Sequence, residues 1–407
     1  MERIKKFLND KMYGSSLWLF SNSLLLTGCG FIFWTIAARL FSSQDVGLAT
    51  TLLSCAELIG MMSLLGFNVA LLRYLPEKKD PKSIINSCFT LSALVAAAAG
   101  VVFLLALPVI SPKLSFVQDH ALFAILFVLF VIIQSLFLLV ESVLIASGQP
   151  RTVVLKNAVF GILKIAFLFV FIGAIGIFVS WGISALIGLF FALWFGRIRY
   201  KISLKRNVIK SMFKVSSGNY LAQLFGTMPA LILPLLITHF INPQTTAYFY
   251  VTLMIASVLF FVPDAIAMPL IAHSAKDQTM LKQNVRKAFF LCFTLIGIGI
   301  LCISLLGGHL LLFFGEEYRS NGVALLILLS LSAIPLSIST MFVAIQNVRR
   351  KMHRVVAIYA ASATLLIVLS LLLLPYGITG IGFAWLIARS CVALAVLYHF
   401  LRRGLLA

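Results

Sequence analysis

The most constraining feature of the sequence is a series of long apolar stretches separated by short polar segments. A helix needs roughly 20 predominantly apolar residues to cross about 30 Å of hydrocarbon. Stretches of that length predict twelve transmembrane helices, near residues 15–38, 48–72, 85–110, 121–146, 152–173, 175–196, 215–240, 246–272, 287–312, 323–346, 355–375 and 379–401. The runs are continuously apolar, which excludes a transmembrane β-barrel, whose strands alternate apolar and polar residues. The sequence predicts an all-α polytopic membrane protein.

Composition supports this class. The chain has 407 residues, of which 61% are hydrophobic and 11% charged, and its mean hydropathy is +1.08, values that exclude a soluble domain with an ordinary surface. The six cysteines lie in the predicted helices without a CxxC pair, so we interpret them as packing residues. The first apolar stretch is too long for a signal peptide and lacks a convincing cleavage site, so we expect it to be retained.

The basic residues alternate from one connecting segment to the next. A net charge of +20 would suggest nucleic acid for a soluble protein, but here the distribution excludes that partner. Basic side chains gather at both ends of the chain and in the segments 73–82, 149–156, 197–214, 276–287 and 349–354. The intervening segments carry only Arg39, Lys113 and Arg319. The positive-inside rule predicts a multi-pass protein of the cell membrane with both termini in the cytoplasm.

The longest basic connector, 197–214, divides the predicted helices into six and six. We therefore predict an N-terminal lobe (1–196), a cytoplasmic linker (197–214) and a C-terminal lobe (215–407). The stretch RLFSSQDVGLATTLL at 39–53 aligns with HFINPQTTAYFYVTL at 239–253, and GIFVSWGISAL at 176–186 aligns with GIGFAWLIARS at 380–390. An even number of helices in each half requires parallel repeats, and these alignments predict a duplicated lobe.

Two motifs resemble a known family. AARLFSSQDVG at 37–47 is similar to the turn between the first two helices of the Wzx-type oligosaccharide and polysaccharide flippases, and LGFNVALLRYLPEKKD at 65–80 is similar to the end of their second helix. The turn ASGQPR at 146–151 resembles another turn of these proteins. This family belongs to the multidrug/oligosaccharidyl-lipid/polysaccharide (MOP) transporter superfamily. Many of its members have further C-terminal helices beyond twelve.

The resemblance implies two six-helix lobes around a central cavity and a lipid-linked oligosaccharide as substrate. The polyprenyl-pyrophosphate carrier would cross from the inner to the outer leaflet by alternating access. Other implied partners are membrane lipids, a coupling ion (Na⁺ or H⁺) and glycosyltransferases or polymerases of the same pathway. We expect Arg39 and Arg73, which lie in the matched motifs, to bind the phosphates, because a guanidinium binds phosphate oxygens in a bidentate way. The alternative is that Arg39 reaches the outer headgroups and Arg73 only starts a basic loop.

Charged residues inside the membrane are costly and mark candidate functional sites. The sequence has five: Glu57, Glu141, Lys164, Asp264 and Arg389. At 1.5 Å per residue, Glu57, Lys164 and Arg389 fall at about 14 to 15 Å from the outer helix ends. This depth allows a Glu57–Lys164 ion pair, and Asp264 with Arg389 is a less well matched pair. The two cations are also candidates for substrate binding, and the three carboxylates are candidates for ion coupling.

Amides complete the candidate cavity. Asn22, Asn68, Asn219 and Gln223 lie in predicted helices, where they would contact sugars or form hydrogen bonds between helices. Helical spacing places Glu57 and Asn68 on one face of the predicted second helix, and Asn157 and Lys164 on one face of the fifth.

The sequence does not predict an enzyme. The six histidines have no metal-ligand spacing, and a P-loop, a nucleophile elbow and a paired-carboxylate site are absent, so we expect neither a metal nor a cofactor. A cation-coupled multidrug exporter of the same superfamily is one alternative, but it would be expected to carry a carboxylate in the first helix, and 15–38 has none. A membrane glycosyltransferase or polymerase is another, but it would need a large outer loop or an acidic catalytic motif.

Overall fold

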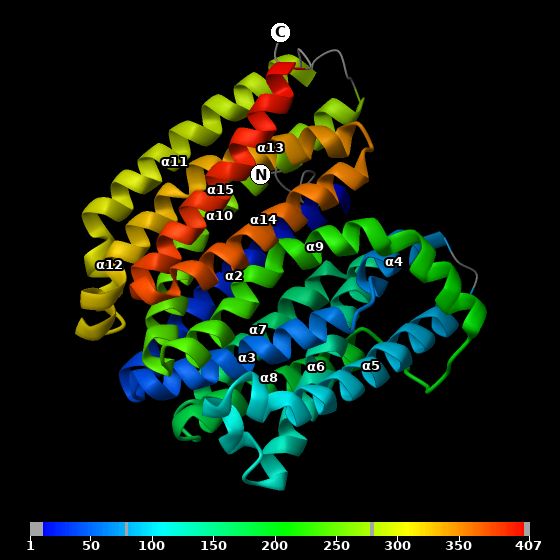
Figure 1. The fold of residues 1–407 in the computed structure, drawn as a ribbon. Helices are drawn as coiled ribbons and strands as arrows, with labels where there is room; N and C mark the ends of the chain where they lie inside the picture. Colours follow the sequence, from blue (N-terminus) through cyan, green and yellow to red (C-terminus); the bar gives the residue numbers. More distant parts are fainter. Residues whose placement is uncertain (1–10, 78–79, 277–280, 403–407) are drawn as a thin grey trace, which may run out of the picture. The chain divides into compact units, whose positions relative to one another are not determined.

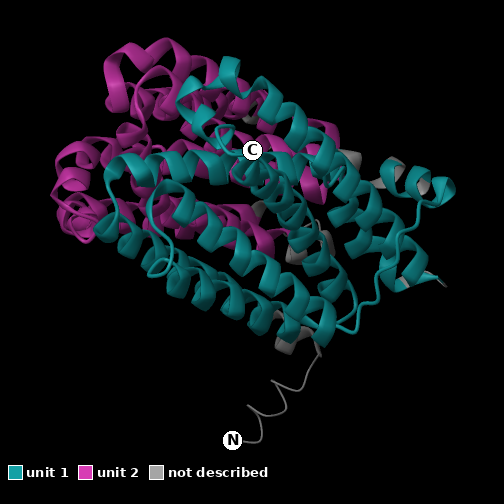
Figure 2. Cartoon of the chain, turned by 90° about the horizontal axis from the view of Figure 1, so that it is seen from below, with its two compact units in different colours: residues 1–220 teal, residues 221–407 magenta. Residues whose placement is uncertain are grey.

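The computed structural model describes residues 11–77, 80–276 and 281–402, and within these ranges the secondary structure is helical (Figure 1). The chain forms two compact units, Met1–Tyr220 and Leu221–Ala407, shown in two colours in Figure 2. Unit 1 contains α2 (Lys11–Leu40), α3 (Ser43–Met62), α4 (Phe67–Tyr74), η1 (Leu75–Glu77), α5 (Pro81–Ile110), η2 (Pro112–Val117), α6 (Ala121–Ala146), α7 (Pro150–Phe167) and α8 (Gly173–Phe195). The helix α9 (Arg206–Phe240) begins in unit 1 and ends in unit 2. Unit 2 continues with α10 (Pro243–Lys276), α11 (Leu281–Leu312), α12 (Glu316–Leu331), α13 (Ala333–Val348), α14 (Met352–Leu373), η3 (Leu374–Tyr376) and α15 (Gly377–Arg402).

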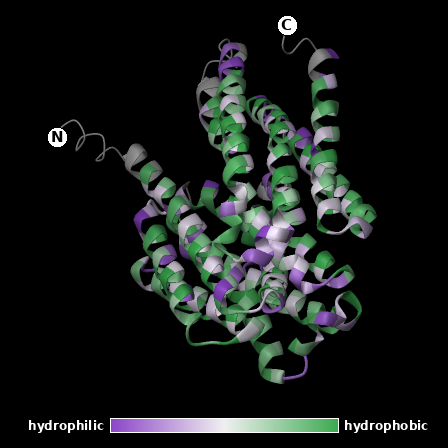
Figure 3. Cartoon of the chain, turned by 90° about the vertical axis from the view of Figure 1, so that its left-hand side faces the viewer, coloured by the Kyte–Doolittle hydropathy of each residue, from purple (hydrophilic) through white to green (hydrophobic). Residues whose placement is uncertain are grey.

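Ten stretches of the described chain are long and apolar enough to cross a membrane. The last of them, Met352–His399, contains both α14 and α15, which pack against each other on either side of η3. The helix α7 is not among the ten, although it was one of the twelve predicted spans. Hydrophobic residues make up most of the helical segments (Figure 3), and many of them are exposed: Val109, Ile172 and Trp194 expose more than 80% of their surface. Such a surface is stable against lipid and not against water, so this is a multi-pass membrane protein.

The two units repeat one packing scheme. In unit 1, α5 packs on α6, α6 packs on α8, and α7 packs on α8. Their counterparts in unit 2 do the same: α11 packs on α12 and α13, these two pack on α15, and α14 packs on α15. The repeated packing agrees with the predicted two-lobe architecture.

The first turn of each unit shows the repeat at the level of single hydrogen bonds. Ser42 caps α3 by accepting from the backbone N–H of Asp45 at 3.1 Å, and Asn242 caps α10 by accepting from the N–H of Thr245 at 2.8 Å. These residues are 200 positions apart, the shift of the sequence alignment. Both caps satisfy a helix-terminal N–H that would otherwise lack a partner. In unit 1, Asp45 also accepts from the N–H of Ala174 and so ties this turn to the start of α8.

Three predicted segments differ in the structure. The predicted helix at 48–72 is two helices, because Leu65 and Gly66 adopt left-handed conformations (φ 51° and 82°) between α3 and α4. The shared face expected for Glu57 and Asn68 was therefore wrong. The predicted helix at 323–346 is interrupted at Ser332, where α12 ends and α13 follows. The basic connector expected at 197–214 is helical from Arg206 onward.

Candidate functional site

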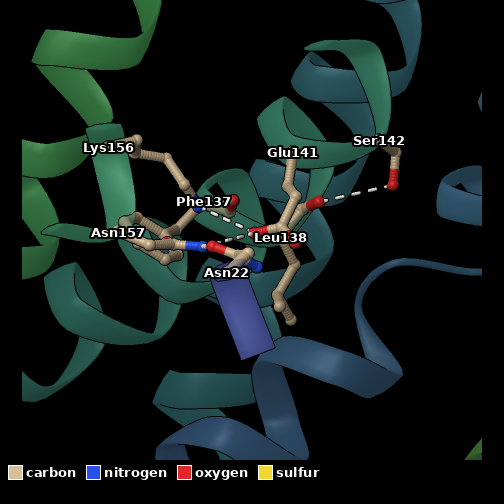
Figure 4. Close-up of polar contacts among 7 residues, drawn as sticks. All are labelled: Asn22, Phe137, Leu138, Glu141, Ser142, Lys156 and Asn157. Carbon is tan, nitrogen blue, oxygen red and sulfur yellow. Dashed lines mark hydrogen bonds and ion pairs between the residues drawn. The ribbon is translucent and has the colours of Figure 1, made fainter. Parts of the chain in front are cut away.

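A buried polar cluster joins three helices of unit 1 (Figure 4). The ammonium of Lys156 on α7 donates to Glu141 Oε2 on α6 at 3.0 Å and to the backbone carbonyl of Phe137 at 3.3 Å. It also lies 3.3 Å from the centroid of the Phe137 ring. Asn157 Nδ2 donates to Asn22 Oδ1 on α2 at 2.7 Å and to Glu141 at 3.4 Å. We call Asn22, Phe137, Glu141, Lys156 and Asn157 the Lys156 cluster.

The charge of Lys156 is fully buried in this cluster and must be stabilised by the groups around it. The Lys156 side chain is 0% exposed, whereas the Glu141 side chain is 27% exposed. A buried ammonium needs a carboxylate and further acceptors to offset the loss of hydration. Glu141, the Phe137 carbonyl and the Phe137 ring supply these. The cluster is thus a fixed cation held between α6 and α7, with Asn22 linking it to α2.

The sequence reasoning missed this residue because Lys156 was assigned to the basic turn at 149–156. In the structure α7 already begins at Pro150, whose fixed φ suits the first helical position, so Lys156 lies well inside the helix. Gly148 adopts φ 71° and allows the sharp reversal from α6 into α7. The predicted helix at 152–173 already contained the lysine, so the sequence placed it in both the helix and the basic turn. Its burial against α6 depends on tertiary packing and has no local signal.

The second intramembrane lysine of unit 1 docks on aromatic rings. Lys164 is 2% exposed, and its ammonium lies 4.2 Å from the ring centroid of Trp181, 4.9 Å from Phe160 and 5.1 Å from Phe33. Glu57 interacts with it electrostatically, but in the described part of the chain no ion pair joins the two. The Glu57–Lys164 ion pair that their depth allowed is therefore not formed. Cation–π contacts from three rings hold the charge in its place.

Unit 2 contains a similar arrangement. The Arg389 guanidinium lies 3.9 Å from the ring centroid of Phe260 and 4.6 Å from that of Trp385, and it donates to Ser332 Oγ at 3.0 Å. Asp264 on α10 is exposed and interacts with Arg389 electrostatically, with no ion pair between them among the described residues. The hydrogen bond from Arg389 to Ser332 thus connects α15 to the break between α12 and α13.

The two tryptophans that receive cations are equivalent in the repeat. Trp181 on α8 aligns with Trp385 on α15, and each carries a cation on its ring. The cations themselves are not equivalent, since Lys164 comes from the neighbouring helix α7 and Arg389 comes from the same helix as Trp385. The two units therefore share the tryptophan and differ in the helix that supplies the cation.

The other predicted residues lie outside these clusters. Arg39 is exposed in the last turn of α2, and Arg73 is exposed at the end of α4, with its guanidinium 5.4 Å from the ring centroid of Tyr74. Asn68 is partly exposed on α4. Asn219 and Gln223 are exposed on α9 at a spacing of four residues, which places them on one helix face.

Hydrogen bonds through Asn157 bring the predicted residues Asn22 and Glu141 together. Two further predicted pairs, Glu57 with Lys164 and Asp264 with Arg389, interact electrostatically. The remaining predicted residues differ in burial. Lys164 is buried among aromatic rings, and Glu57, Asn68 and Arg389 are partly exposed. The exposed residues are Arg39, Arg73, Asn219, Gln223 and Asp264.

A family model described as polysaccharide biosynthesis protein matches residues 36–321 of the chain. No curated protein matches the sequence. Among solved structures, the fold is similar to the lipid II flippase MurJ in an inward closed conformation, with a TM-score of 0.76, 11% identity, and coverage of 95% of this chain and 87% of that chain.

The fold is also similar to multidrug resistance transporters of the MATE family in the MOP superfamily. An inward-facing structure has a TM-score of 0.72, 13% identity and 94% coverage of both chains. An outward-facing one has a TM-score of 0.59, 13% identity, and coverage of 96% of this chain and 95% of that chain. The chain therefore belongs to the polysaccharide biosynthesis protein family, in agreement with the predicted Wzx-type resemblance, and has the fold of MOP-superfamily flippases and transporters.

Proposed function

We propose that the protein moves a polyprenyl-pyrophosphate-linked oligosaccharide from the inner to the outer leaflet by alternating access. The observation that carries this proposal is the match of 36–321 to a polysaccharide biosynthesis family in a chain with a flippase-like fold. A membrane protein of such a pathway handles its sugar on a lipid carrier. The enzymes that build and polymerise the glycan are the expected partners.

Exposed polar side chains on apolar helices support a hydrated path for the sugars. Asn219 and Gln223 share a face of α9, and both residues are exposed. An amide in contact with hydrocarbon would cost free energy, so we expect this face of α9 to meet water or a polar substrate. We assign Asn219 and Gln223 to the oligosaccharide, and Arg39 and Arg73, whose guanidinium groups are exposed, to the pyrophosphate.

Buried residues have a different role in this proposal. Asn22 and Lys164 are almost fully buried, and Arg389 is engaged by Phe260, Trp385 and Ser332, so they reach the substrate only after a rearrangement. Asn68 on α4 is partly exposed and stays a candidate for sugar contact. We therefore rank the exposed residues above the buried ones as primary contacts.

Glu57 and Asp264 are the stronger candidates for coupling to Na⁺ or H⁺. Glu141 already forms an ion pair with the Lys156 ammonium. A coupling ion would have to displace that ammonium, which belongs to the protein itself. Glu57 interacts electrostatically with Lys164, and Asp264 with Arg389, but in the described part of the chain neither carboxylate forms an ion pair. This leaves their oxygens available to a mobile ion.

The experiment is lipid flipping in proteoliposomes. The full chain is reconstituted with a fluorescent polyprenyl-pyrophosphate oligosaccharide, and arrival at the opposite leaflet is read as quenching by an impermeant reductant. Arg39→Ala is expected to reduce the rate at least tenfold, because a lost charge-assisted phosphate contact contributes about 1.5–3 kcal/mol. Arg319→Ala, which removes an exposed arginine from the same predicted membrane side, is the matched control and should leave the rate unchanged.

Protein-free liposomes set the background. A wild-type rate equal to that background would remove the proposed function, and an unchanged rate in Arg39→Ala would remove the assigned role of Arg39. Export of cationic drugs in place of the lipid-linked sugar would instead favour the multidrug exporter, the alternative suggested by the MATE-like fold.

A further inference from the structure

A groove of about 200 Å³ lies between two helices of unit 2, and no residue assigned to transport above lines it. We call it the α10/α11 groove, and its lining residues are Ile266, Pro269 and Leu270 from α10, and Asn284, Lys287, Ala288 and Leu291 from α11. Five of these side chains are apolar, and the two polar ones lie in the first two turns of α11. The groove is therefore an apolar slot with a polar end.

Helical spacing explains why both helices face the groove and yet leave it unfilled. Asn284, Lys287, Ala288 and Leu291 lie on one face of α11 at intervals of three and four residues. On α10, Pro269 has no backbone N–H, and a proline within a helix disturbs the regular backbone around it. Ala288 is also small. The groove is thus lined on one side by a short side chain and on the other by a proline ring.

The groove opens toward an apolar surface. Next to its lining residues, Met268 is 70% exposed on α10 and Phe290 is 76% exposed on α11, and Leu291 in the groove wall is 49% exposed. In a membrane protein, exposed apolar side chains of this size are in contact with lipid tails. An occupant of the groove would therefore enter sideways from the bilayer.

The polar end carries positive charge. Lys287 and its neighbour Arg286 are both exposed, and they belong to the basic segment 276–287, which we predict to be cytoplasmic. On α10 the nearest acidic residue is Asp264, about 7.5 Å along the helix axis from Pro269, and it interacts electrostatically with Arg389. The start of α11 also contributes a positive helix dipole. The charge at the groove end complements an anionic headgroup.

From this geometry we propose that the α10/α11 groove binds an anionic phospholipid of the cytoplasmic leaflet. One acyl chain lies in the apolar slot, and the headgroup phosphate contacts Lys287 and the amide of Asn284. The groove is too small for an oligosaccharide, and a single phosphodiester matches its few basic side chains. The site is independent of the transported substrate, so it stands or falls separately from the flippase proposal.

The test is retention of phospholipid by the purified full chain, measured by native mass spectrometry after reconstitution in equal amounts of phosphatidylglycerol and phosphatidylcholine. Wild type is expected to retain phosphatidylglycerol preferentially. Lys287→Ala should reduce that preference about fivefold, the effect of one basic residue at an anionic surface, and Lys287→Arg should keep it. Lys210→Ala, the same change at an exposed position on α9, should have no effect.

A second variant tests the apolar slot without changing charge. Ala288→Trp fills the groove and should lower phosphatidylglycerol retention, whereas Ala98→Trp on the exposed face of α5 should not. Equal preference in wild type and Lys287→Ala would overturn the proposal. So would displacement of phosphatidylglycerol by an equimolar polyprenyl phosphate in wild type but not in Lys287→Ala, because the groove would then belong to the carrier lipid.

Discussion

Single residues in this protein are governed by how their charges are hydrated or paired. Lys156, Lys164 and Arg389 are three cations held in different ways: by a carboxylate, by three aromatic rings, and by two rings with a hydroxyl. Each arrangement replaces water with groups of negative potential. The carboxylates Glu57 and Asp264 interact electrostatically with Lys164 and Arg389, and no ion pair joins them in the described parts of the chain.

The Lys156–Glu141 pair gives an asymmetric prediction. Glu141→Ala should destabilise the protein by about 3–5 kcal/mol, because it leaves a fully buried ammonium without its carboxylate. Lys156→Met should cost less, because the remaining Glu141 side chain is 27% exposed and can be hydrated. The measurement is thermal unfolding of the purified variants in detergent. The double variant Lys156→Met/Glu141→Ala should be more stable than Glu141→Ala alone, and the reverse order of the single variants would contradict this account.

Elements in this fold are broken where the backbone is forced into unusual conformations. The apolar run at 48–72 looks continuous in sequence, yet it forms two helices, α3 and α4. The helix is broken at Leu65 and Gly66, where the backbone angle φ is positive. A glycine adopts a positive φ without steric cost, and other residues do not. The same run length therefore supports either one straight helix or two shorter ones.

Gly66 offers a test of this break. Gly66→Ala should destabilise the protein by about 1–2 kcal/mol, because a Cβ disfavours the left-handed conformation. Gly66→Asn should cost less, because asparagine tolerates it. The control is Gly28→Ala in α2, where a Cβ meets nothing within 4 Å and helix propensity should improve. Midpoints of thermal unfolding measure all three, and a stabilising Gly66→Ala would show that the left-handed turn is not required.

The whole molecule is a duplicated membrane bundle, and its orientation follows from charge. The two units repeat their helix packing and even the cap of their first turn, at Ser42 and Asn242. Repeats with parallel topology place equivalent segments on the same side of the membrane. The basic segments then all fall on one side, which we propose is the cytoplasm.

Cysteine labelling in intact cells tests this orientation. In a cysteine-free background, Lys113→Cys should react with an impermeant maleimide added outside, and Lys210→Cys should react only after the cells are opened. The background is needed because Cys302 and Cys391 are exposed. If Lys210→Cys is labelled from outside and Lys113→Cys is not, the protein has the opposite orientation in the membrane.

Much of the architecture could be predicted from sequence because its determinants are local. The length of an apolar run, the side on which lysines gather and the repeated Trp181/Trp385 segment are read along one chain, and they led to the membrane class and the two lobes. The motifs at 37–47 and 65–80 led to the family. The candidate site was predicted less well. Arg39 and Arg73 came from motifs, but the partners of Lys164 and Arg389 were assigned by depth alone, and depth does not specify rotation about a helix axis.

The sequence by itself determined that this chain crosses a membrane many times as a duplicated bundle, because hydrocarbon forces every backbone group to be satisfied within its own helix. Only the tertiary structure decided which charges meet. Lys156 contacts Glu141 because α7 starts at Pro150 and turns that side chain toward α6, and Lys164 contacts Trp181 because α7 packs on α8. Those contacts depend on helix starts, rotations and packing partners, which involve residues distant in sequence and have no local signature.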